Sequence, residues 1–127
     1  MASLRVILLL MMIWFASCKR IDKHAYVYSK NVDRIVIGCY ELDENDTGYV
    51  SFLLQKPFDQ RESLSRKYHG YNVYQAKMDA LQRISGIAAP GKISNDFDTS
   101  IVRFYTHWAL EKGYIKQNET PIPANNL

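Results

Sequence analysis

The chain has 127 residues and a mass of 14.7 kDa, which limits it to one folded domain. Hydrophobic residues make up 47% and charged residues 23%, values near the globular average that argue against a disordered, collagen-like or coiled-coil chain. Two cysteines exclude a disulfide scaffold and a structural zinc module, and the net charge of +3 is too small to indicate nucleic-acid binding.

Residues 1–17 have the pattern of a secretory signal peptide. The basic residue Arg5 precedes an apolar run from Val6 to Ser17 that ends in small residues. A transmembrane helix needs about 20 apolar residues, so this run is short for a span. The sequence predicts export, and an uncleaved signal anchor in a larger envelope complex is an alternative.

The segment Phe15-Ala16-Ser17-Cys18 resembles the lipobox of bacterial lipoproteins, in which a cysteine after two small residues is lipidated and becomes the mature N-terminus. The resemblance implies that Cys18 carries diacylglyceryl and amide-linked acyl chains and attaches the protein to the membrane. The segment departs from the pattern at Phe15, where the family usually has an aliphatic residue. Lys19 stands where an aspartate would typically favour the inner membrane, so the resemblance implies an outer-membrane lipoprotein facing the periplasm. Plain secretion into the periplasm is the alternative.

The next part of the chain favours β-strands. Residues 25–29 and 34–42 are rich in β-branched and aromatic side chains, and apolar residues alternate with others over 49–56. A cluster of turn-forming residues at 43–48 separates the last two segments. This pattern predicts an antiparallel β-hairpin, or a three-stranded sheet if 25–29 joins it.

Helical signals follow the strand-like segments. A short helix of mixed polarity is expected over 59–67. A longer one is predicted from Asn72, as N-cap of a capping box with Gln75, to Gly86. Apolar residues recur along it at helical spacing, and its opposite, polar face carries Gln75, Lys77, Asp79, Gln82 and Arg83.

A further helix is predicted from Asp98 as N-cap to Gly113, with Trp108 on its buried face. These elements together predict an α+β fold, in which a small antiparallel sheet is covered on one face by two or three helices. The expected organisation is a signal peptide at 1–17, a tether at 18–24, one domain at 25–116 and an unpacked polar tail at 117–127.

The acidic turn resembles part of a calcium-binding loop. Its oxygen-bearing and glycine residues occupy positions 1, 3, 5 and 6 of the EF-hand pattern, namely Asp43, Asn45, Thr47 and Gly48. Position 12, which needs a glutamate, is Leu54. We therefore expect a solvated turn, and no metal or other cofactor is predicted.

Few residues indicate catalysis. His107 and Glu111 are four residues apart on a predicted helix, and His69 is the other histidine that could act with a carboxylate. Cys39 lies in an apolar segment, where we expect a buried thiol of raised pKa rather than a nucleophile. No catalytic motif is recognised, so no catalytic residue is predicted.

Aromatic and basic residues gather between 66 and 74. The candidate binding residues are Arg66, Lys67, Tyr68, His69, Tyr71 and Tyr74. Tyrosines give large contact area at a small entropic cost, and cations favour an anionic partner. The alternative is that these tyrosines cover the hydrophobic core.

The sequence thus predicts a small exported protein, attached to the membrane by lipid, that binds a protein or another envelope component. It predicts no catalytic activity and no nucleic-acid partner. The alternative from another class is a small envelope enzyme that uses His107 or His69 with a carboxylate.

Overall fold

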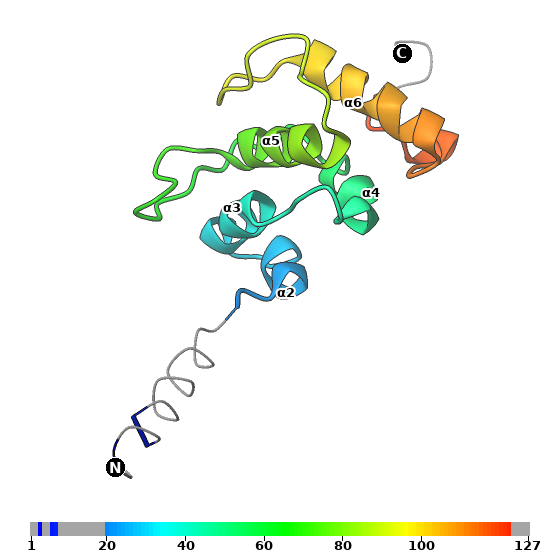
Figure 1. Ribbon diagram of the computed structural model, residues 1–127. Helices are drawn as coiled ribbons and strands as arrows, with labels where there is room; N and C mark the ends of the chain where they lie inside the picture. The colour runs from blue at the N-terminus through cyan, green and yellow to red at the C-terminus, as the bar shows by residue number, and fades with distance from the viewer. Residues whose placement is uncertain (1–2, 4–5, 8–19, 123–127) are drawn as a thin grey trace.

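The computed structural model describes residues 3, 6–7 and 20–122. The elements in chain order are α2 (Lys23–Val27), α3 (Val32–Tyr40), η1 (Thr47–Tyr49), α4 (Val50–Leu53), α5 (Val73–Ser85), α6 (Thr99–Lys112) and η2 (Gln117–Glu119). Helix α5 lies between α3 and α4 on one side and α6 on the other, and α2 packs against α3 (Figure 1). The described residues form an all-α domain whose core lies around α5.

The predicted α+β fold is wrong. The segments 25–29, 34–42 and 49–56, expected as strands, fall for the most part in α2, in α3 and in η1 with α4, and their last residues lie just beyond these helices. The described residues contain no sheet, and their one β-type contact is an isolated antiparallel bridge between Glu62 and Asn72. That bridge lies where the short helix at 59–67 was expected, and no α-helix forms there.

Side-chain caps favour a helical start for two of the three strand-like segments, those in α2 and α3. Asp22 Oδ1 accepts a hydrogen bond of 3.2 Å from the Ala25 N–H at the start of α2. Asn31 Oδ1 accepts one of 3.2 Å from the Arg34 N–H at the start of α3. Each cap satisfies a backbone donor that has no partner within its helix, and so favours helix over strand.

Helix α3 is apolar on more than one side because it is packed between two other helices. Ile35, Val36 and Cys39 are buried in the core, and α3 contacts both α2 and α5. Gly38 allows α2 to approach closely, since a Cβ at this position would lie 2.8 Å from the Val27 nitrogen. Burial of the helix on two sides, rather than a central position in a sheet, accounts for the apolar residues on more than one side of this segment.

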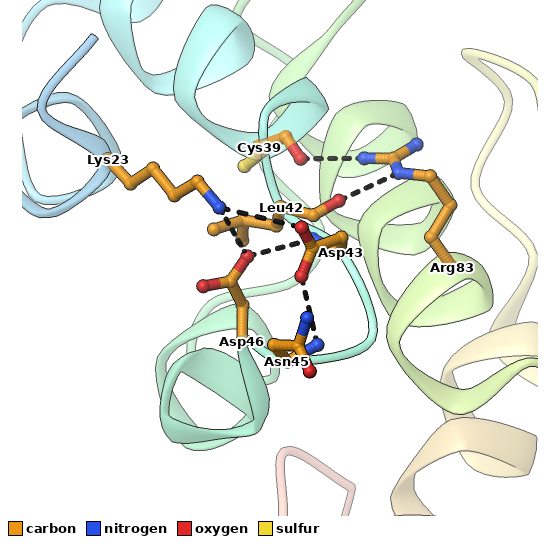
Figure 2. A network of polar contacts seen from close by, with 7 residues as sticks. All are labelled: Lys23, Cys39, Leu42, Asp43, Asn45, Asp46 and Arg83. Carbon is orange, nitrogen blue, oxygen red and sulfur yellow. Dashed lines mark hydrogen bonds and ion pairs between the residues drawn. The ribbon is translucent and has the colours of Figure 1, made fainter. Parts of the chain in front are cut away.

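Lys23 forms ion pairs with two carboxylates of the acidic turn at 43–48. Its Nζ lies 2.9 Å from Asp46 Oδ2 and 3.8 Å from Asp43 Oδ2 (Figure 2). The Asp43 N–H also donates to Asp46 Oδ2, at 2.8 Å. These hydrogen bonds and the nearby ammonium hold the pKa of Asp46 below its ordinary value, against the opposing effect of burial. The carboxylates thus join the start of α2 to the turn before η1.

The two longer helices begin and end as predicted. Asn72 Oδ1 accepts a 2.8 Å hydrogen bond from the Gln75 N–H, and Gly86 ends α5 in the left-handed conformation. Helix α6 is capped by Asp98 and ends at Gly113, which is also left-handed. The capping box is only half formed, since Gln75 Oε1 is buried without a hydrogen-bond partner.

The segment after α6 packs further than expected. Ile115 and Ile122 are both buried in the core, and Ser51 Oγ donates to Glu119 Oε2 at 3.2 Å. Residues 117–122, which were expected to be an unpacked tail, therefore cover part of the domain. Cys18 and most of the predicted signal peptide lie outside the described residues.

Candidate functional site

Most of the predicted binding residues lie on one loop between α4 and α5. We call residues 63–71 the projecting loop, because the chain between α4 and α5 extends beyond the ends of the helices (Figure 1). Arg66, Lys67 and His69 are exposed on it, and Tyr71 is 39% exposed. Leu64, which the sequence analysis did not single out, is 76% exposed and is the most exposed large hydrophobic residue described.

A carboxylate of α3 fixes one end of the projecting loop. Asp33 Oδ1 accepts hydrogen bonds from the Leu64 N–H at 2.8 Å and from Ser63 Oγ at 2.9 Å. These two bonds, the first above all, hold the pKa of Asp33 below its ordinary value. Ser63 Oγ also lies 2.8 Å from Ser65 Oγ. The backbone of Leu64 is therefore anchored while its side chain points into solvent.

Backbone contacts close the other end of the loop. The Ser63 N–H donates to the Tyr71 carbonyl at 2.8 Å, and the Gly70 N–H donates to the Ser63 carbonyl at 3.0 Å. Asn95 Nδ2 donates to the Gly70 carbonyl at 3.0 Å. Gly70 has a φ of 83°, which glycine adopts readily. The loop is thus held in one shape from both sides.

The two loop tyrosines contact the domain beneath. The rings of Tyr68 and Tyr40 stack with centroids 4.5 Å apart, and the Tyr71 ring lies 5.8 Å from Tyr40. Lys67 Nζ lies 5.3 Å from the centre of the Tyr68 ring. Tyr68 is half-buried, so it partly covers the core, as the alternative interpretation expected. Tyr71 leaves more of its ring open to solvent.

Tyr74 does not belong to the candidate site. It is fully buried on α5, and its ring packs against Phe97 with centroids 5.1 Å apart. Its hydroxyl accepts a 3.0 Å hydrogen bond from the Asp98 N–H. Helical periodicity turns Tyr74 toward the core, where it packs as the alternative interpretation of these tyrosines expected, and it offers no surface to the projecting loop.

The histidines are not brought together with carboxylates. His69, His107 and Glu111 are exposed, and no hydrogen bond or ion pair joins either histidine to a carboxylate in the part of the chain described. Cys39 is completely buried, and burial raises the pKa of its thiol to about 12. The expectation of a buried thiol with raised pKa is confirmed, although Cys39 lies on a helix.

Besides the exposed Leu64, sequence reasoning also missed a cleft of about 780 Å³. Segments 28–30, 52–61, 73–77 and 118–121 contribute residues to its walls. Lys77, expected on the polar face of α5, lines this cleft although it is only 5% exposed. Its ammonium donates a 2.9 Å hydrogen bond to the Gln55 carbonyl. The periodicity of polar residues along α5 placed Lys77 on the outer face of the helix. It could not show that α4 and the segment after it cover this lysine.

The chain matches no known family model, no curated protein and no solved structure. Over residues 3, 6–7 and 20–122, no helix is both long and apolar enough to cross a membrane.

Proposed function

We propose that the chain is an exported, lipid-anchored protein of the bacterial envelope whose folded domain binds a partner protein through the projecting loop and catalyses no reaction. The sequence pattern that ends at Cys18 supports the anchor. The geometry of the loop supports the binding, and its strongest single observation is the 76% exposure of Leu64.

Leu64 is exposed in a fixed position. Asp33 holds its backbone N–H at 2.8 Å, so the backbone of the loop cannot turn this position inward without losing that bond. An apolar side chain presented in this way loses little conformational freedom on binding, which favours affinity. The expected partner offers an apolar pocket that receives Leu64.

The charged residues near Leu64 indicate which charges surround the apolar pocket of the partner. Arg66 and Lys67 are exposed two and three residues further along the loop, which has no acidic residue, while the exposed Glu62 precedes the loop. Rim charges of one sign steer association with a surface of opposite sign more than they add affinity. We therefore propose that carboxylates surround the apolar pocket of the partner.

The anchor would hold the domain close to the membrane. Helix α2 begins at Lys23, so few residues separate it from Cys18. At about 3.5 Å per fully extended residue, a tether of four residues would reach at most about 14 Å. The acyl chains implied by the lipobox resemblance supply stable attachment, since one chain alone binds a bilayer only reversibly.

Mass spectrometry of the membrane-extracted protein tests the anchor. We expect the mature chain to begin at Cys18 and to carry acyl chains, and a Cys18→Ala variant to lose both. A mature N-terminus at Lys19, or an unmodified Cys18 in soluble protein, would contradict lipid anchoring. Retention of residues 1–17 would indicate an uncleaved anchor instead.

Site-specific photocrosslinking in the cells that produce the protein tests the binding surface. A photoreactive amino acid at position 64 should give one discrete protein adduct, and the same amino acid at exposed position 112 on α6 should give none. Arg66→Glu and Lys67→Glu in the chain that carries the probe at position 64 should weaken that adduct. Equal adducts from positions 64 and 112, or an adduct insensitive to both charge reversals, would contradict the proposal.

A further inference from the structure

The cleft beside α5 has a charge imbalance that its own residues do not neutralise. Four cationic side chains and two carboxylates line it, so its net formal charge is +2. The cations are Lys30, Lys56, Arg61 and Lys77, and the carboxylates are Asp59 and Glu119. Its volume of about 780 Å³ lies within the range of small-ligand sites, roughly 300–1,000 Å³.

Lys77 is a buried cation in the wall of this cleft. It is 5% exposed, and within residues 20–122 no carboxylate oxygen lies within 4.0 Å of its ammonium. Its Nζ has a carbonyl partner, Gln55, and lies 5.0 Å from the centre of the Phe52 ring. A buried ammonium without an opposite charge is unfavourable, and burial accordingly lowers the pKa of Lys77. An anion in the cleft would remove that penalty.

The neighbouring arginine is already occupied. Arg61 Nη2 donates to Asp59 Oδ2 at 2.7 Å, and its Nε donates to Asp59 Oδ1 at 3.0 Å. Phosphate groups are typically recognised by an arginine fork that is free to bind two oxygens. Here that fork holds Asp59, which would also repel a doubly charged phosphate. The arrangement favours a singly charged anion at Lys77.

The backbone at Lys56 gives a second, independent observation. Lys56 is the one non-glycine residue with positive φ in the described chain, at 44°. Such a conformation is unfavourable for a residue with a Cβ and is often retained where function requires it. Lys56 lines the same cleft and is exposed, so this strained position adds a second lysine to the lining of the site.

The walls near Lys77 are apolar and aromatic. The partly exposed rings of Phe52 and Tyr28 line the cleft, and the buried side chains of Leu54, Val73 and Ile35 lie behind them. A ligand that pairs with the ammonium would therefore place an apolar body against these side chains. Burial of that body supplies affinity, while the ion pair fixes its orientation.

We propose that this cleft binds a monoanionic carboxylate with an apolar or aromatic body, its carboxylate paired with Lys77 and its body against Phe52. The carboxylate can belong to a small organic acid or to the C-terminal residue of a peptide. This site is separate from the projecting loop, and its test does not depend on the protein partner proposed above.

Fluorine NMR of the full chain in phosphatidylcholine nanodiscs provides the test, with empty nanodiscs as the blank. The probes are 4-fluorophenylacetate, its neutral amide, 4-fluorophenyl phosphate, and the peptide Gly-Gly-(4-fluoro-Phe) with a free or an amidated C-terminus. We expect the carboxylates to bind about tenfold or more tightly than the matching amides, because only they pair with the ammonium. Whichever free acid binds more tightly identifies the source of the carboxylate.

Two variants assign the effect to the cleft. Lys77→Met removes the ammonium but keeps the length of the side chain, and should weaken carboxylate binding about tenfold or more. Lys112→Met, at an exposed position of α6, should leave it unchanged. Circular dichroism of each variant verifies that the helices persist. Equal binding of acid and amide, tighter binding of the phosphate, or no binding of any probe would overturn the proposal, and none of these three outcomes requires a variant.

Discussion

Arg83 Nη2 donates a hydrogen bond of 2.7 Å to the carbonyl oxygen of Cys39. Arg83 Nε donates a second bond of 3.0 Å to the Leu42 carbonyl, so one side chain of α5 binds the end of α3 (Figure 2). Carbonyls at a helix C-terminus lack partners within the helix, and a cation there also interacts favourably with the helix dipole. The contact connects two helices that both bury their apolar faces in the core.

Loss of this contact should destabilise the domain measurably. We expect Arg83→Met to lower the free energy of unfolding by about 2 kcal/mol, because two part-buried carbonyls lose charged donors. Arg66→Met, at an exposed loop position, should change it by less than about 0.5 kcal/mol. Urea denaturation followed by circular dichroism compares the two, and equal midpoints would contradict a capping role for Arg83.

Two glycines offer a matched test of the α2–α3 packing. In Gly38→Ala the new Cβ would meet the Val27 nitrogen at 2.8 Å, so we expect a loss of about 1–3 kcal/mol from overpacking. At Gly48 no atom lies within 4 Å and φ is not positive. Gly48→Ala should therefore be neutral, or stabilising by up to about 1 kcal/mol. Thermal unfolding measures both, and a neutral Gly38→Ala would mean that α2 does not pack closely on α3.

The first half of the chain shows why a strand prediction fails here. Val, Ile and Tyr are frequent in strands, but Ile35, Val36 and Cys39 also have the spacing of one helical face. The caps Asp22 and Asn31 were present in the sequence and indicate helix starts. The strand prediction gave more weight to the β preference of these residue types than to their helical spacing. In the structure, the contacts that α3 makes with α2 and α5 favour the helix.

The two longer helices, α5 and α6, were predictable because their signals are local. Asn72, Asp98 and the left-handed glycines act within one or two turns of their own helix, so no tertiary knowledge is needed. The site depends on contacts between distant residues. Asp33 lies 31 positions before Leu64, and Gln55 lies 22 positions before Lys77. No pattern within either segment reveals such pairs.

The buried thiol of Cys39 should be unreactive in the folded protein. In a Cys18→Ser background, reaction with a disulfide reagent at pH 8 should be about a hundredfold slower than in urea, because the folded thiol is buried and rarely ionised. Absorbance of the released thiolate measures the rate. Equal rates would mean that Cys39 is accessible.

The same thiol affects stability at high pH. Its pKa is 9.0 ordinarily and about 12 in the fold, so above about pH 9 the unfolded chain loses a proton that the folded chain retains. The contribution of this raised pKa to stability is complete below pH 9 and is lost as the pH rises toward 12. A Cys39→Ala variant should show a smaller decline in stability over that range.

Trp108 tests the buried face of α6. It is 8% exposed and packs near Tyr114, with ring centroids 5.4 Å apart. We expect Trp108→Ala to destabilise the domain by about 3–5 kcal/mol, since it removes a large buried aromatic side chain. Lys112→Ala, at an exposed position of the same helix, should change stability by less than about 1 kcal/mol. Similar denaturation midpoints would mean that the buried face is assigned wrongly.

Asp33 tests whether the projecting loop is fixed in advance of binding. In Asp33→Ala the Leu64 N–H and Ser63 Oγ lose their shared acceptor, so amide hydrogen exchange over residues 63–71 should become faster while the helices remain protected. Glu44→Ala, an exposed carboxylate of the turn before η1, should leave the exchange pattern unchanged.

The pH dependence of the loop follows from the same carboxylate. The pKa of Asp33 is held below its ordinary value of 3.8, so its contribution to loop order is complete above that value and is lost as the pH falls through the lowered pKa.

Photocrosslinking from position 64 tests whether order in the loop matters for binding. Asp33→Ala should reduce the adduct although Leu64 keeps its side chain and its exposure, because the loop no longer holds one conformation. An undiminished adduct together with faster exchange would show that order in the loop is not needed for binding.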